Sequence, residues 1–153
     1  VAFWVKRLNH LAEQPIKGCG WYPDKKIRLW KAGCGEWSGT NPHDRFEVSD
    51  AFTQSIGELP GDLLHFTYSN FEQIRLQALK FGKIGAIAVQ NKPWPYLLLK
   101  LLISPQVKFF KNFFIKRGVF YGFKGLVICY WQWRESLLKY GKGFWISFNN
   151  SFK

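Results

Sequence analysis

The sequence has no methionine, only three cysteines and almost no acidic residues in its second half. The cysteines are Cys19, Cys34 and Cys129. Their odd number and the lack of a Cys-x-x-Cys pair argue against a disulfide framework and a structural zinc site. Reduced thiols are the simplest interpretation, and a Cys19–Cys34 disulfide is the alternative in an oxidising compartment. Because a reading frame normally begins with methionine, we expect a fragment or a processed product.

Long apolar runs are also missing. The most apolar stretch, residues 94–103, is too short to span a bilayer and contains a lysine. Residues 1–10 lack the apolar core and cleavage site of a signal peptide.

The shortage of acidic residues produces an uneven charge. Residues 1–69 hold 8 Lys/Arg and 8 Asp/Glu, whereas residues 70–153 hold 14 Lys/Arg and 2 Asp/Glu, so the net charge of +12 lies entirely in the second half. A basic half predicts an anionic partner, such as lipid headgroups, nucleic acid or a phosphorylated glycolipid. The neutral half is the better place for chemistry.

Aromatic residues make up 19% of the chain, which indicates a folded, ring-packed protein. Residues 1–68 read as short strands joined by loops. We expect strands at residues 2–11, 27–30, 36–38, 45–48 and 62–66, the last as a buried strand, and a loop at residues 18–24.

Residues 69–141 read as helices, and residues 142–153 as a tail of unassigned structure. A capping box of Ser69 and Glu72 predicts the first helix start, and Pro93 its end. We expect further helices from Pro95 to before Pro105, from Ser104 to about Gly118, and from Phe120 to a stop at Gly141. The helix from Ser104 to about Gly118 is predicted to be basic and amphipathic, with Val107, Phe109, Phe110, Phe113 and Phe114 on one face.

Two histidine-containing stretches in the neutral half could carry chemistry. Asp44, next to His43 in a Gly- and Pro-marked loop, could act as a general base, although aspartates in such loops often only bond turn amides. His65 ends an apolar strand and could bind a metal, although a lone histidine there is more often a hydrogen-bonded core residue.

A third set of candidates surrounds the segment WYPDKKIRLW. Arg28 could clamp a phosphate or a carboxylate, or Asp24 and Arg28 could simply pair and close a turn. Trp21 and Trp37 could stack on sugar rings, or pack in the core. These residues alone indicate an aromatic α+β domain with a basic helical half and do not name a reaction.

The order of the motifs does suggest a family. The segments run RLN, then GWYPDKKIRLW, then W-x-G-x-N-P-H-D-x-F-E, then LLHFTYS, then a long helix and basic aromatic helices. Over nearly the whole chain this resembles the C-terminal, acceptor-side part of bacterial family 2 glycosyltransferases related to lipopolysaccharide-core β-glucosyltransferases.

The resemblance implies part of an α/β GT-A fold and an inverting, metal-dependent sugar transfer. The donor would be a nucleotide sugar and the acceptor a glycolipid or surface polysaccharide. It places Asp44 and His43 on the family's His-acid pair, which usually has Glu where Asp44 stands, and makes Asp44 the candidate base. It makes His65 a metal or diphosphate contact, and puts Asp24 and Arg28 in the motif that shapes the acceptor side.

The divalent metal, Mg²⁺ or Mn²⁺, would be held mostly by an upstream Asp-x-Asp motif, which this sequence lacks. We therefore expect these 153 residues to be inactive alone. The expected location is the cytoplasmic face of the cytoplasmic membrane. The expected partner there is the anionic membrane surface, and no nucleic-acid partner is expected. A basic membrane-surface module without catalysis is the alternative.

Overall fold

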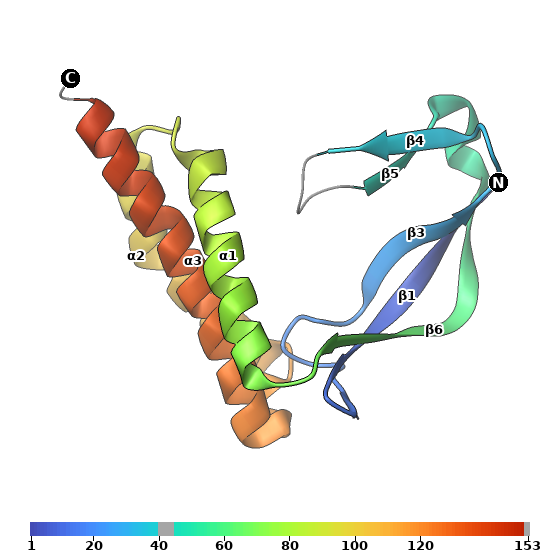
Figure 1. Ribbon diagram of the computed structural model, residues 1–153, viewed down its shortest axis with the longest axis horizontal. Helices are drawn as coiled ribbons and strands as arrows, with labels where there is room; N and C mark the ends of the chain where they lie inside the picture. The colour runs from blue at the N-terminus through green and yellow to red at the C-terminus, as the bar shows by residue number, and fades with distance from the viewer. Residues whose placement is uncertain (40–44, 152–153) are drawn as a thin grey trace. The chain divides into compact units, whose positions relative to one another are not determined.

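The computed structural model describes residues 1–39 and 45–151, and it divides the chain into two compact units (Figure 1). The strand unit comprises Val1–Lys17 and Trp21–Thr67. The helical unit comprises Gly18–Gly20 and Tyr68–Lys153.

The strand unit is built around β1 (Ala2–Leu11), which pairs antiparallel with β2 (Gln14–Pro15) and β3 (Asp24–Trp30) and also pairs with β6 (Ile56–Tyr68). A second, two-stranded antiparallel sheet consists of β4 (Gly35–Ser38) and β5 (Arg45–Val48), and the short 3-10 helix η1 (Asp50–Ser55) follows it. The strand predictions at 2–11 and 45–48 are confirmed to the residue.

A small core joins the two sheets of this unit. Ala2 and Ile27 from the first sheet are buried together with Cys34 and with Phe46 of β5. The Trp30 ring stacks on Phe46 with centroids 4.1 Å apart. This contact fixes the β4–β5 hairpin against β3.

The predicted buried strand at residues 62–66 is wrong in its burial. These residues lie in β6, but Leu63, Leu64 and Phe66 are 45%, 58% and 69% exposed. β6 pairs with β1, and an apolar run alone does not reveal whether another layer covers it.

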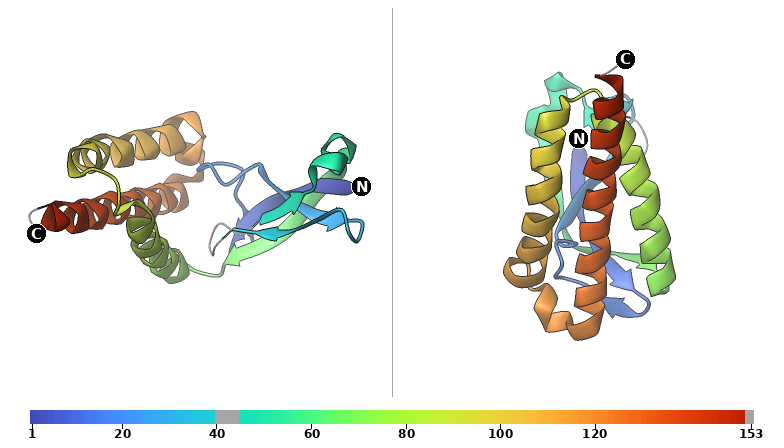
Figure 2. Two further views of the ribbon diagram at one scale, coloured as in Figure 1. Left: turned by 90° about the horizontal axis from the view of Figure 1, so that it is seen from above. Right: turned by 90° about the vertical axis from the view of Figure 1, so that its left-hand side faces the viewer.

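The helical unit has three long helices, α1 (Phe71–Val89), α2 (Trp94–Phe110) and α3 (Gly122–Asn150). Figure 2 shows α3 lying between α1 and α2, and it contacts both. A π-helical turn, η2 (Lys111–Ile115), and a 3-10 turn, η3 (Gly118–Tyr121), connect α2 to α3.

The capping box of α1 is displaced by one residue from its predicted position. Asn70 is the cap: its side-chain oxygen accepts the Gln73 N–H at 3.0 Å, and the Gln73 side chain accepts the Ser69 N–H at 2.7 Å. Glu72, the predicted partner of Ser69, instead pairs with Arg75 at 2.6 Å. Asn is as good a cap as Ser, so the local sequence allows both.

The predicted helix breaks at Pro105 and Gly141 are wrong, because α2 and α3 run through them. Pro105 is fully buried inside α2, and residues 142–150 extend α3. Near the end of α3, the Ser147 hydroxyl donates to the Lys92 carbonyl oxygen at 2.8 Å. Tertiary packing of this kind outweighs local helix-breaking preferences.

The tripeptide Gly18–Gly20, predicted as loop, packs inside the helical unit. The Cys19 N–H donates to the Lys116 carbonyl at 2.9 Å, and the Gln132 amide donates to the Cys19 carbonyl at 3.0 Å. A Cβ on Gly18 would lie 2.7 Å from the Tyr121 ring and 2.9 Å from the Arg117 carbonyl oxygen. The glycines of this motif therefore have a packing role.

All three cysteines are free and buried. The neighbour of Cys19 is Cys129 of α3, not Cys34. The hydrogen bond between these two thiols, together with burial, raises the pKa of Cys19, whereas the same bond lowers the pKa of Cys129.

Candidate functional site

Asp24, one of the candidate site residues, forms an ion pair with Arg7 of the RLN motif. They face each other across β1 and β3, and the guanidinium donates to one Asp24 oxygen, with Nε at 3.0 Å. Lys26 lies 4.0 Å from the other oxygen. The expected alternative, a local Asp24–Arg28 pair, is therefore wrong, because cross-strand register places Arg7 nearer than the residue four positions along the same strand.

Asn9, in the RLN motif, is the centre of a polar chain that sequence reasoning missed. Its buried amide donates to the Trp21 carbonyl at 3.0 Å, and its oxygen accepts from the Thr67 hydroxyl at 2.8 Å. The Thr67 oxygen in turn lies 3.1 Å from His65 Nδ1. The same hydroxyl also lies 3.2 Å from the His65 carbonyl oxygen, so Thr67 links Asn9 to His65.

The hydrogen bonds of Asn9 are expected to contribute measurably to stability. Asn9→Ala removes the hydrogen bonds of the Asn9 side chain to the Trp21 carbonyl and the Thr67 hydroxyl, and we expect it to lower the free energy of unfolding by about 1–3 kcal/mol. Gln54→Ala is the control, because Gln54 is exposed in η1 of the same unit. Urea unfolding measures both, and equal small losses would contradict the structural role of Asn9.

The resemblance makes His65 a metal contact, with most of the ligands of the metal expected upstream of this chain. Within residues 1–39 and 45–151, no three His, Cys, Asp or Glu side chains lie close enough together to hold a metal ion. His65, hydrogen-bonded to Thr67, belongs to no such group in the described part of the chain.

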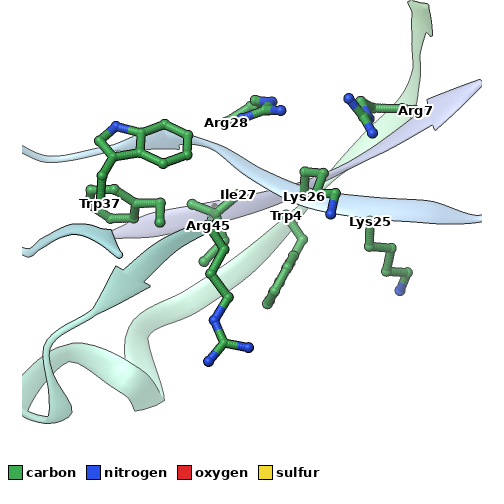
Figure 3. Close-up of a pocket in the computed structure, with 9 residues that line it drawn as sticks. Trp4, Arg7, Lys25, Lys26, Ile27, Arg28, Trp37 and Arg45 are labelled. Carbon is green, nitrogen blue, oxygen red and sulfur yellow. The ribbon is translucent and has the colours of Figure 1, made fainter. Parts of the chain in front are cut away.

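A pocket of about 320 Å³ lies among β1, β3, β4 and β5 (Figure 3). Its lining residues are Trp4, Arg7, Lys25, Lys26, Ile27, Arg28, Trp37, Arg45 and Phe46. Five of these nine are cationic and none is acidic. In Figure 3, Arg7 and Arg28 lie on one side of β3, and Trp4, Lys25 and Arg45 lie on the other. Its composition suits an anionic group held beside aromatic rings.

Arg28 has a special place in this pocket. Phe3 pairs with Leu29 and Trp4 pairs with Ile27, so Arg28 is the extra residue of a β-bulge. Bulges redirect a side chain away from the regular alternation of the strand. The Arg28 guanidinium carbon lies 5.9 Å from the centroid of the Trp37 ring, which is half exposed. The structure therefore brings two of the predicted site residues together.

Among the five cationic residues that line this pocket, Arg28 is the one whose charge is least neutralised by carboxylates. Arg7 is paired with Asp24, Lys25 with Glu58 at 2.6 Å, and Arg45 with Glu47 at 2.7 Å. Hydrogen bonds from Lys25, and then from Lys6, lower the pKa of Glu58. In the described part of the chain, Arg28 has no carboxylate partner. It is thus the cation of this pocket best able to bind an external anion.

Part of this basic character has a structural explanation. Among the described strands β3 pairs with β1 alone, and lysines and arginines on an edge strand oppose pairing with other chains. This explanation covers Lys25 and Lys26, but it does not account for the bulge that redirects Arg28.

The remaining predicted residues are placed differently. Trp21 does not line the pocket; its carbonyl is held by Asn9. His43 and Asp44 lie outside the described residues, so their predicted role stays a prediction. Arg45 and Phe46, missed as pocket residues, belong to the same W-x-G-x-N-P-H-D-x-F-E motif.

The helical unit carries a second candidate site, an exposed apolar face along α2 and η2. Its members, each at least half exposed, are Leu99, Leu102, Ile103, Val107, Phe110 and Phe114. Phe110 stacks on Phe114 with centroids 5.9 Å apart. The predicted five-residue apolar arc thus divides, because Phe109 and Phe113 are half-buried and stack on each other. Ile115 and Phe120 beyond this face are 77% and 81% exposed.

No helix in the described part of the chain combines the length and the apolar character needed to cross a membrane. No protein-family model matches the sequence, and no solved structure matches the fold.

Proposed function

We propose that this chain is the acceptor-side part of a family 2 glycosyltransferase that acts at the cytoplasmic face of an anionic membrane. The observation that carries the membrane part is the exposed apolar face of α2 and η2, which is flanked by Lys100 and Lys111. An apolar face with lysines at its border is the arrangement of helices that lie in the membrane interface. The glycosyltransferase part rests on the order of the sequence motifs.

The pocket of the strand unit supports an acceptor-binding role. The Trp37 ring can stack on a sugar, and the adjacent Arg28 guanidinium can hold a phosphate or carboxylate of a glycolipid. In the proposed reaction, the oxygen of the acceptor hydroxyl attacks the anomeric carbon of the donor sugar while the Asp44 carboxylate takes the hydroxyl proton. The bond from the anomeric carbon to the diphosphate oxygen breaks, and the nucleoside diphosphate leaves.

The gene sequence upstream of the Val1 codon is the first test. We expect an open frame encoding strands, helices and an Asp-x-Asp motif. A stop codon in that frame would overturn the glycosyltransferase proposal.

The second test uses the product of the complete gene in a sugar-transfer assay. We expect Asp44→Asn to lower kcat/KM by about 10²- to 10⁴-fold. The control is Asp50→Asn, an exposed acid at the start of η1, which should keep full activity. Unchanged transfer by Asp44→Asn would remove Asp44 as the base.

A membrane-surface module without catalysis is the second candidate. It is favoured by the same apolar face, which needs no chemistry to bind lipid. Vesicle binding by a complete gene product that has no donor-binding motif would establish this second candidate in place of the first.

A further inference from the structure

A groove of about 580 Å³ in the helical unit is lined mainly by α2 and α3 and is strongly basic. Five lysines line it: Lys100, Lys108, Lys111, Lys116 and Lys139. The single acidic residue among its lining is Glu135. The groove therefore carries a large positive excess within a small volume, which favours an anionic ligand.

The internal pairing leaves most of this charge free. Glu135 pairs with Lys108 at 3.5 Å. Lys100 and Lys139 lie over the rings of Tyr96 and Tyr140, at 5.5 and 5.4 Å from the centroids. Within the part of the chain that the structure describes, neither of these lysines, nor Lys111 or Lys116, forms an ion pair.

The groove also borders the apolar face. Ile103 and Val107 line the groove and, at 50% and 55% exposure, belong to the apolar face as well. A ligand filling the groove would thus place its charge among lysine ammonium groups and its apolar part along α2. This juxtaposition suits an amphiphile, not a purely polar anion.

We infer that this groove binds the phosphomonoester headgroup of a membrane lipid, with the acyl chains against the apolar face. A phosphomonoester carries nearly two negative charges at neutral pH and three acceptor oxygens, so several lysines can bond it at once. A phosphodiester carries one charge and satisfies fewer of them. The inference rests on the membrane part of the proposed function and adds headgroup selectivity.

The test compares vesicles of phosphatidic acid in phosphatidylcholine with vesicles of phosphatidylglycerol in phosphatidylcholine, adjusted to equal surface charge. We expect the chain to bind the phosphatidic acid vesicles about tenfold more tightly. Replacement of Lys100, Lys111 and Lys139 by glutamine should abolish this preference and lower binding to phosphatidic acid vesicles by about 100-fold.

The matched control replaces Lys80, Lys83 and Lys92 by glutamine. These lysines are exposed on α1 and the turn after it, so the change in net charge is the same. We expect the control to retain the preference, and a loss equal to that of the groove variant would mean that binding follows diffuse charge and would overturn the inference.

Two other outcomes separate this inference from the proposed function. Vesicle binding without any headgroup preference would overturn the groove alone and leave the membrane proposal standing, whereas no vesicle binding would overturn both. Inorganic phosphate, tested as a free ligand, should bind only weakly. Equally tight binding of free phosphate would overturn the assignment to lipid.

Discussion

Replacing Phe110 and Phe114 with serine is expected to lower the affinity of the chain for anionic vesicles by about 10- to 150-fold. Fully burying an apolar side chain is worth about 1.5–3 kcal/mol. The two rings are 58% and 55% exposed, so about half of that value is still to be gained from each on binding lipid. Because the rings stack on each other at the surface, they can insert as one unit.

Sedimentation with vesicles measures this affinity. The matched control is Leu76→Ser with Ile87→Ser, two α1 side chains that are 52% and 63% exposed in the same unit. We expect the control to bind as the parent does. High salt should weaken the lysine contribution of the parent and leave the apolar contribution, since only charge is screened.

An equal loss in the control would contradict a specific apolar face. The apolar face could instead be covered by a second copy of the chain. Analytical ultracentrifugation would then show a concentration-dependent dimer that the Phe110 and Phe114 substitutions abolish. That result would replace the membrane with self-association as the role of this face.

The features predictable from sequence are those set by local patterns. Residues 2–11 are rich in strand formers, and this segment and the brief run at 45–48 form strands with the predicted ends. Breaker residues were less informative. Pro105 and Gly141 lie inside helices whose packing against one another compensates for the local cost.

The candidate site was predictable only in part, because its geometry depends on contacts between separate strands. Arg28 and Trp37 were identified as types of residue able to bind sugars and anions, and the structure brings them together. The bulge at Arg28 depends on cross-strand register, which the sequence of one strand does not encode. The Arg7–Asp24 pair and the Asn9 chain likewise join residues from separate strands.

The packing of α1 against α3 leads to the second large effect, at Gly82. Ala78, Gly82 and Ala86 are buried at four-residue spacing on α1. A Cβ on Gly82 would lie 2.8 Å from Leu138 Cβ and 3.1 Å from the Glu135 carbonyl oxygen of α3. Neither atom is the far end of a flexible side chain, so the two helices themselves would have to separate.

Gly82→Ala and Gly141→Ala should therefore change stability in opposite directions. Both glycines lie in helix interiors, where alanine gains up to about 1 kcal/mol from backbone propensity. At Gly141 the nearest atom to a new Cβ is 3.7 Å away, so this gain is kept. At Gly82 overpacking costs about 1–3 kcal/mol and outweighs it, and Gly82→Leu should lower the free energy of unfolding by about 3 kcal/mol or more.

Urea unfolding followed by far-ultraviolet circular dichroism reports on these helices directly. If Gly82→Ala stabilised the protein as much as Gly141→Ala, the close approach of α1 to α3 would be wrong. The comparison isolates packing, because the same methyl group is added to the same kind of backbone in both variants. It also bears on the membrane proposal, since α3 holds α2 in place and a loosened bundle would lose the fixed border between the apolar face and its lysines.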